Sequence, residues 1–247
     1  MIEVEICSNG FLSTQQAAWG GATRVELCDN LGEGGTTPSI GAVEVCTKIS
    51  GIEIWPILRP RGGDFLYQTE EKESMLRDVF YFKNLNISGI VTGALLPNGQ
   101  IDIDFLQSLQ KVAPQLPFAF HRAIDLTANP MEELEKLVSI GFVRVLSSGG
   151  CNKAEDGIDL LQLFQKTFGK HIQIMPGSGI DENNVVKILK ETGCKQVHVS
   201  LRTSLKSEMA FQKEGVLMGK PDFGGEYTYH RTDSNRVKNI LSLTKTV

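Results

Sequence analysis

The sequence lacks a long hydrophobic run and an excess of charge of either sign. No apolar segment approaches the ~20 residues needed to cross a bilayer, so we expect no membrane contact. The 25 Lys and Arg residues against 29 Asp and Glu residues give a net charge of −4, without blocks of like charge. This composition argues against a nucleic-acid partner. The N-terminal segment MIEVEICSNG has acids where a signal peptide has basic residues, which predicts a cytoplasmic protein.

Cysteine is scarce and shows no pairing pattern. The five cysteines are Cys7, Cys28, Cys46, Cys151 and Cys194, and no C-x-x-C motif occurs. An odd number of cysteines in a reducing compartment argues against a disulfide framework. Each thiol is therefore either a small buried hydrophobe or a ligand for a soft metal ion.

Short β-rich runs alternate with helix-like segments along most of the chain. The runs cover residues 2–7, 24–28, 53–59, 89–94, 118–122, 144–148, 172–176 and 196–200. Eight βα units in this length predict an α/β fold, a TIM-like (β/α)8 barrel in one domain spanning residues 1–247. An open doubly wound sheet is the alternative, but even spacing without a long insertion favours closure.

The C-terminal end departs from this repeat. The eight βα repeats occupy residues 1–202, whereas residues 203–232 lack clean periodicity. A helical pattern returns only within residues 233–245. We therefore expect an irregular excursion and a terminal helix in residues 203–247, with the eighth barrel helix displaced or short.

Charged residues occupy the inward-facing positions of the first, second and eighth strands. Side chains alternate along a strand, and the apolar sets must face the surrounding helices. This phase turns Glu3, Glu5, Arg24, Glu26 and His198 towards the barrel interior. A structural ion network is one explanation. A functional site is the other, because barrel active sites lie at the C-terminal ends of the strands.

The stretch ILRPRGGDFLY places charges at the end of the third strand. Arg59 and Arg61 flank a proline, and two glycines precede Asp64. Two arginines at the barrel mouth predict a binding site for an anion, facing the same cleft as Glu5 and Glu26. A salt-bridged rim is the structural alternative.

Two further stretches contribute candidates to the same mouth. The segment MPGSGI joins the seventh strand to a helix, and Gly177, Ser178 and Gly179 could cradle an anion with backbone N–H groups. A simple glycine turn is the alternative. Arg202 follows the eighth strand. It is a further candidate ligand for the anion. His121, at the end of the fifth strand, is a candidate general base or a hydrogen-bonded structural residue.

Cys7 and Cys28 occupy equivalent positions on adjacent strands. Neighbouring strands lie ~4.8 Å apart, so the two thiols could chelate a soft ion such as Cu(I). His198 or Met175 could complete the metal site. Packing is the alternative role for both thiols.

Several motifs together resemble the CutC family of copper homeostasis proteins. They are VEIC, GGATRVELCDNLGEGGTTPSIG, ILRPRGGDFLY, GALLPNGQID, FAFHRAID, RVLSSGG, IMPGSGI and HVSLR, in order from the first strand to Arg202. The resemblance implies a cytoplasmic TIM-like barrel with an atypical C-terminal end, forming a homodimer or higher homo-oligomer. It also implies Cu(I) binding through Cys7 and Cys28. Ser178 and Leu201 depart from the usual pattern, as does Cys151.

Two functions follow from these observations. The first is copper binding and handling. The second is an enzyme acting on a small anionic or phosphorylated metabolite. In that case Glu5, Glu26, His121 and Asp64 are the candidate acids and bases, and the arginines bind the anion. The sequence identifies no substrate.

Overall fold

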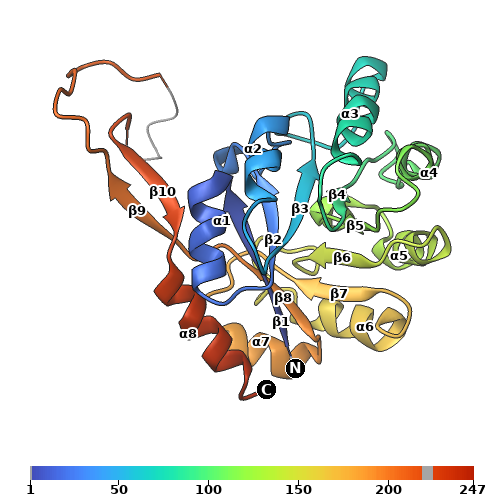
Figure 1. Ribbon diagram of the computed structural model, residues 1–247. Coiled ribbons are helices and arrows are strands. Elements are labelled where there is room, and N and C mark those ends of the chain that lie inside the picture. The colour runs from blue at the N-terminus through green and yellow to red at the C-terminus, as the bar shows by residue number, and fades with distance from the viewer. Residues whose placement is uncertain (1, 219–224) are drawn as a thin grey trace.

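The computed structural model describes residues 2–218 and 225–247, and its main body is a nearly closed barrel of parallel strands (Figure 1). The eight barrel strands are β1 (Glu3–Asn9), β2 (Arg24–Cys28), β3 (Glu53–Leu58), β4 (Ile90–Thr92), β5 (Phe118–Phe120), β6 (Arg144–Ser147), β7 (Gln173–Pro176) and β8 (Gln196–Val199). Their order in the sheet is β7-β6-β5-β4-β3-β2-β1-β8. The predicted TIM-like barrel is confirmed.

Helices follow the strands and cover the outside of the barrel. They are α1 (Gly10–Trp19), α2 (Ile40–Cys46), α3 (Thr69–Phe82), α4 (Ile103–Val112), α5 (Pro130–Ser139), α6 (Ile158–Phe168) and α7 (Val185–Thr192). Local sequence fixes several helix starts. A reciprocal capping box of Gln68 and Glu71 opens α3, the Asp102 side chain accepts from Phe105 N–H at the start of α4, and Pro130 begins α5.

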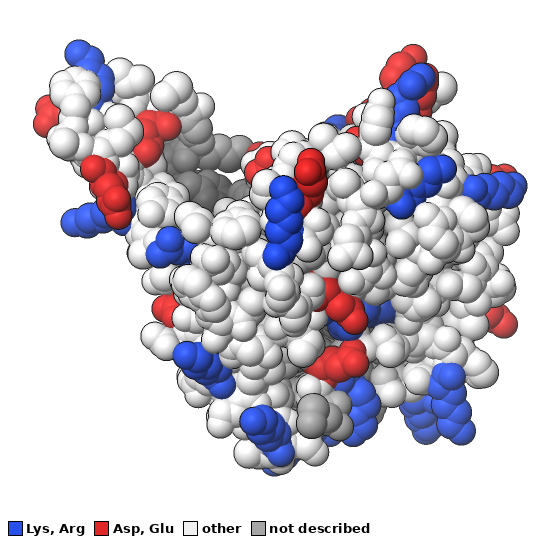
Figure 2. All heavy atoms as spheres, in the orientation of Figure 1, with Lys and Arg blue, Asp and Glu red and all other residues white. Residues whose placement is uncertain are grey.

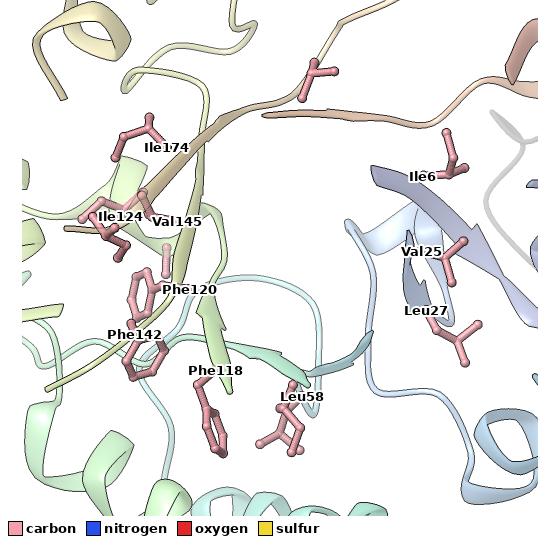
Figure 3. Packing of buried hydrophobic residues seen from close by; sticks show 14 of the residues in the cluster. Ile6, Val25, Leu27, Leu58, Phe118, Phe120, Ile124, Phe142, Val145 and Ile174 are labelled. Atoms are coloured by element: carbon pink, nitrogen blue, oxygen red, sulfur yellow. The ribbon is translucent and has the colours of Figure 1, made fainter. Parts of the chain in front are cut away.

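The main hydrophobic core lies between the strands and the surrounding helices. Its members include Ile6, Val25 and Leu27 from β1 and β2, and Phe118 and Phe120 from β5 (Figure 3). These side chains alternate with the inward-facing set, as expected for strands whose outer face packs on helices. A smaller apolar cluster of Cys28, Trp55, Ile57, Val91 and Ala119 packs separately.

The strand register sets which inward side chains are neighbours. Glu5 on β1 pairs with Arg24 on β2 and with His198 on β8, and Cys7 pairs with Glu26. Within the described residues no backbone ladder joins β7 to β8, but the Gln196 amide donates to Gln173 across this seam. The polar positions of β8, β1 and β2 therefore meet inside the barrel.

The C-terminal segment contains more regular structure than the sequence predicted. Strands β9 (Arg202–Lys206) and β10 (Thr228–Thr232) pair antiparallel and project from the barrel as an arm (Figure 1). The expectation of an irregular excursion over 203–232 is therefore wrong for these strands. Residues 207–218 contain no helix or strand, and 219–224 lie outside the described residues. Helix α8 (Ser234–Thr244) falls within the predicted range and packs on α1 and α7.

The surface carries charges of both signs. On the face shown in Figure 2, Lys and Arg residues are interspersed with Asp and Glu residues. Among the described helices, none combines the length and apolar character needed to cross a membrane.

Candidate functional site

A cavity of about 520 Å³ opens at the C-terminal end of the barrel strands. Its polar wall includes Cys7, Glu26, Arg59, His121, Arg122, Asp125, Ser178, His198, Ser200 and Arg202. Its apolar wall includes Leu31, Ile57, Phe65, Leu126, Leu146 and Ile180. A volume of this size accommodates a small organic molecule and exceeds the need of a bare metal ion.

Glu5 lies below this cavity, at the centre of a buried ion network. Its Oε2 accepts from Arg24 Nε at 2.7 Å and lies 3.1 Å from Arg144 Nη2. Its Oε1 accepts from His198 Nδ1 at 2.9 Å. Burial opposes ionisation, but Arg144 and the His198 hydrogen bond hold the pKa of Glu5 well below its usual range. Glu5 is thus a fixed anion that orients its neighbours and does not line the cavity.

His198 connects Glu5 to the floor of the cavity. Nδ1 donates to Glu5, so the other ring nitrogen is directed towards Cys7 and Glu26; Nε2 lies 3.7 Å from Glu26 Oε2. Burial alone would lower its pKa. Hydrogen bonds with Cys7 and Glu5 outweigh burial and raise the pKa of His198 well above 6.5. The imidazole is therefore a cation with the Glu5 carboxylate on one side and the Cys7 sulfur on the other.

Cys7 and Cys28 are both free, but they are not at equivalent strand positions as expected, since Cys7 pairs with Glu26 and Cys28 pairs with Asn9. A hydrogen bond from Cys28 and a second from His198 lower the pKa of Cys7 well below that of an ordinary thiol. The same contact, together with burial, raises the pKa of Cys28. Cys7 is thus the thiolate of the pair and faces the cavity, whereas Cys28 is buried behind it and lies 3.4 Å from Glu26 Oε2.

Glu26 is the second carboxylate of the site, and its environment differs from that of Glu5. Burial and the nearby negative charges of Cys7 and Glu5 raise the pKa of Glu26 to about 7, although His198 opposes this shift. When the environments of two carboxylates push their pKa values apart, one can stay ionised as a fixed charge while the other transfers protons. Glu26 therefore suits proton exchange near neutral pH.

Three potential metal-ligand atoms converge on the floor of the cavity. The donor atoms of Cys7, Glu26 and His198 all lie within 4.8 Å of one another. The sequence placed Cys7 and His198 in this group but assigned Glu26 to acid–base chemistry. Met175 is not brought to the cluster, because its sulfur lies 3.9 Å from Arg24 Nη2, deeper in the barrel.

Arg59 lines the cavity, but most of its guanidinium hydrogen bonds go to backbone carbonyls. Nη1 donates to Glu33 O and Gly35 O, and Nη2 donates to Gly63 O. The guanidinium therefore ties the loop after β2 to the loop after β3. Its Nε–H is buried and has no hydrogen-bond partner among the described residues.

Arg61 does not face the cavity, contrary to the sequence-based expectation. Its guanidinium pairs with Asp64 at 2.9 Å and with Glu71 at 2.6 Å, and stacks over Tyr67. Pro60 and the two glycines turn the chain outward, so Arg61 and Asp64 close the loop on itself. This arrangement gives no geometric support to anion binding by Arg61 or acid–base chemistry by Asp64.

His121 lines the cavity on the opposite side from Cys7, as a neutral imidazole. Its Nδ1 accepts from Ala123 N–H at 3.2 Å, which places the proton on Nε2. Burial and the nearby Arg59 charge lower the pKa of His121 to about 3. A histidine in this state is a hydrogen-bond donor and a poor general base. Nε2 is buried without a partner among the described residues.

The remaining anion candidates divide between the cavity wall and its support. Ser178 and Gly179 line the cavity in left-handed backbone conformations, with φ of 83° and 67°, and their N–H groups have no acceptor among the described residues. Gly177 N–H donates to Ser147 O and is used by the fold. Arg202 reaches the cavity wall, where its Nε donates to Ser200 Oγ.

Sequence reasoning missed two residues that shape the site. Arg144 is 2% exposed, pairs with Glu5 and stacks over the Trp55 ring at 4.2 Å. Its position on the sixth strand gave a signal, since it is a charge at the start of an otherwise apolar strand. Phe65 covers Arg59 and His121, and nothing in the pattern of its loop indicated this.

Known proteins resemble this chain along its whole length. The CutC family model matches residues 2–203. A CutC family protein of Parabacteroides distasonis is 42% identical over 239 residues, covering 96% of this chain and 98% of its own. The human copper homeostasis protein cutC homolog is 38% identical over 244 residues, covering 99% of this chain and 89% of its own.

A solved structure gives the same result. The crystal structure of the copper homeostasis protein CutC from Streptococcus agalactiae superposes with a TM-score of 0.77 at 33% identity. The match covers 80% of this chain and 98% of that one. The matched fold, the full-length relatives and the family match agree. This chain therefore belongs to the CutC family of copper homeostasis proteins.

Proposed function

We propose that this protein binds and handles Cu(I) in the cytoplasm, with Cys7, Cys28 and His198 as ligands. The observation that carries the proposal is that the Cys7 sulfur and a ring nitrogen of His198 converge on the cavity floor, with the Cys28 thiol buried behind Cys7 and shifting its pKa. Cu(I) prefers thiolates and accepts imidazole nitrogen. The family membership and the names of its relatives support a role in copper homeostasis.

The donor set fits a soft ion better than a hard one. Two sulfurs and a ring nitrogen are soft or borderline ligands, whereas Glu26 supplies a single hard oxygen. Glu5 orients the His198 ring through Nδ1, the arrangement that outer carboxylates give to metal-bound histidines. Binding must displace protons from Cys28 and His198, so copper uptake releases protons.

A Cu(I) competition assay with bicinchoninate tests this proposal. The Cys7→Ser and Cys28→Ser variants should each lose high-affinity Cu(I) binding while keeping the circular dichroism spectrum of the wild type. Cys151→Ser is the matched control, because Cys151 is a partly exposed free thiol outside the cluster. Wild-type affinity in the Cys7→Ser, Cys28→Ser double variant would contradict the proposal.

A second candidate function is an enzyme acting on a small anionic or phosphorylated metabolite. The specific observation in its favour is the chain of contacts from Glu5 through His198 to the Cys7 thiolate, which opens on a cavity of about 520 Å³. A thiolate beside an oriented imidazolium is an arrangement used in covalent catalysis. Glu26, with a pKa of about 7, could exchange protons with the bound molecule.

Mass spectrometry of a metabolite extract incubated with the copper-free protein tests this second function. One anionic metabolite should disappear with wild type and persist with Glu26→Gln, which keeps the shape of the side chain. An extract left unchanged by the wild-type protein would contradict enzymatic activity.

A further inference from the structure

Two buried hydrogen-bond donors without partners lie under one aromatic ring in the wall of the cavity. Arg59 is 5% exposed and His121 is 4% exposed, and both line the cavity. Arg59 Nε and His121 Nε2 have no hydrogen-bond partner among the described residues. Buried donors without partners cost free energy, and native proteins contain few of them. Two such donors, just after β3 and β5 on either side of β4, call for a common explanation.

The ring of Phe65 covers both groups. Its centroid lies 4.6 Å from the His121 ring and 5.0 Å from the Arg59 guanidinium carbon. The Phe65 side chain is only partly buried, although its backbone carbonyl is fixed by Leu95 N–H at 2.8 Å. The ring can therefore rotate while the loop stays in place. Its rotation towards the cavity would open both donors to a ligand.

The surroundings make this spot attractive to a negative charge. Arg59 carries a positive charge and has no carboxylate within ion-pair distance among the described residues; its acceptors are backbone carbonyls. A buried cation without a counter-ion is unfavourable unless an anion joins it. The nearby His121 is neutral and carries its proton on Nε2, so it adds a donor without adding charge.

The fold holds the His121 ring in place. The imidazole packs on Gly93, where an added Cβ would lie 2.5 Å from the ring carbon Cε1. Its Nδ1 is fixed by Ala123 N–H. The unpaired Nε2 is thus a positioned group, as expected for a ligand-binding donor.

We propose that Arg59 Nε–H and His121 Nε2–H bind the phosphate or carboxylate group of a small molecule in the cavity, and that the Phe65 ring covers this site when it is empty. The apolar wall of Leu31, Ile57 and Leu126 would contact the rest of the molecule. The inference is independent of copper binding. It deepens the second candidate function by assigning the anionic group of the ligand to a defined wall.

Calorimetric titration with inorganic phosphate, and separately with benzoate, tests the site and distinguishes phosphate from carboxylate ligands. His121→Asn keeps an acceptor where Nδ1 receives Ala123 N–H but removes the Nε2 donor. His121→Gln removes that acceptor but keeps a donor where Nε2 lies. Affinity should fall about tenfold or more in His121→Asn, the range for a lost hydrogen bond to a charged group, and change little in His121→Gln.

Two further variants sharpen the test. Phe65→Ala should bind at least as tightly as wild type and associate faster, because no ring has to move. Arg61→Ala should bind like wild type, since Arg61 pairs with Asp64 and Glu71 outside the cavity. Melting temperatures of all variants separate binding from folding. The proposal is overturned if neither probe binds wild type or Phe65→Ala, or if His121→Asn binds as tightly as wild type.

A Cu(I) competition assay on His121→Asn keeps this result separate from the proposed function. The variant should keep wild-type Cu(I) affinity, because His121 is not part of the Cys7 cluster. Parallel loss of copper and anion binding would show that the substitution disturbs the whole mouth, and it would overturn the assignment to His121.

Discussion

The Glu5 carboxylate lies inside the barrel among the side chains of Arg24, Arg144 and His198. Burying so many charges is favourable only while each has its partner, because an unpaired charge has lost its hydration. Arg144 is the most buried of the cations, at 2% exposure. Its guanidinium also stacks on Trp55. The interior of this barrel is therefore more sensitive to single substitutions than an apolar interior.

Replacing Arg144 should test this sensitivity directly. We expect Arg144→Leu to lower the free energy of unfolding by about 3–5 kcal/mol, the range for breaking a buried ion pair. Arg144→Lys keeps the positive charge, so it should lower the free energy of unfolding by less. Urea denaturation followed by circular dichroism measures both. If the leucine variant is as stable as wild type, the ion network contributes little to folding.

His121 should make the protein less stable in acid. Its pKa falls from 6.5 to about 3 on folding, so below pH 6.5 the unfolded chain binds a proton that the folded chain does not. The contribution of neutral His121 to the free energy of unfolding is complete above pH 6.5 and is lost as the pH falls towards 3. The free energy of unfolding should change by at most about 1.4 kcal/mol per pH unit from this group.

His121→Asn provides the control for this pH dependence, because asparagine does not titrate. The difference in unfolding free energy between wild type and variant should shrink or reverse as the pH falls below 6.5. Urea denaturation at several pH values measures it. A difference that stays constant between pH 7 and pH 4 would show that His121 is not buried in the neutral state.

The sequence predicted the direction of a side chain correctly where the residue lies within a strand, because side chains alternate between the two faces there. Alternation turned Glu5, Glu26 and His198 inward, and the structure places all three in the interior or the cavity. It failed for Arg61, because the two glycines after it let the loop turn away from the barrel. Beyond the end of a strand, the direction of a side chain depends on the loop conformation, and the alternation of residues along the strand no longer predicts it.

At the scale of elements, α8 takes the place of a regular eighth barrel helix. It packs close to the end of α1, where Gly20 meets Val237. The predicted position of this helix was correct because capping and apolar spacing are local signals; the Asp233 side chain accepts from Asn235 and Arg236 N–H groups. The β9–β10 hairpin was missed because its strands, RTSLK and TYHRT, are mostly polar and half-buried, so they lack the alternating apolar pattern on which strand prediction depends.

The contact between α1 and α8 can be tested with one methyl group. A Cβ at residue 20 would lie 2.5 Å from the Val237 Cβ, and Gly20 has an ordinary helical φ of −72°. Gly20→Ala should therefore destabilise the protein by about 1–3 kcal/mol through overpacking alone. Urea denaturation measures the loss.

Gly41 offers a matched control within a helix. A Cβ at this position of α2 would meet no heavy atom within 4 Å. Gly41→Ala should thus stabilise the protein by about 0.5–1 kcal/mol through helix propensity. Similar effects of the two substitutions would show that α8 does not pack tightly on α1.

At the scale of the whole molecule, β1 pairs with both β2 and β8 and so joins the first and last repeats. Residues 1–247 should therefore unfold as one domain. The two tryptophans report on different places, since Trp19 is exposed on α1 and Trp55 is buried in the barrel. We expect tryptophan fluorescence and circular dichroism to give one coincident urea transition. Two separated transitions would indicate two independently folding parts.

The projecting arm leads to a prediction about assembly. Phe211, Leu217 and Met218 are 72%, 63% and 83% exposed in the segment that joins β9 to β10. Apolar side chains gathered on an arm that leaves the barrel are costly in water, and two strands alone are marginally stable. A second copy of the chain offers an identical arm, which suits a two-fold symmetric contact. We therefore expect a homodimer that forms through this arm.

Sedimentation velocity over a range of concentrations measures this assembly. Phe211→Asp and Leu217→Asp should shift the protein towards monomer, because a charge in the contact loses its hydration without gaining a partner. Leu163→Asp is the control, since Leu163 is 44% exposed on α6, on the barrel itself. The barrel makes its own core, so the monomeric variants should keep the wild-type circular dichroism spectrum. A wild-type protein that sediments as a monomer at every concentration would exclude the arm as a dimer contact.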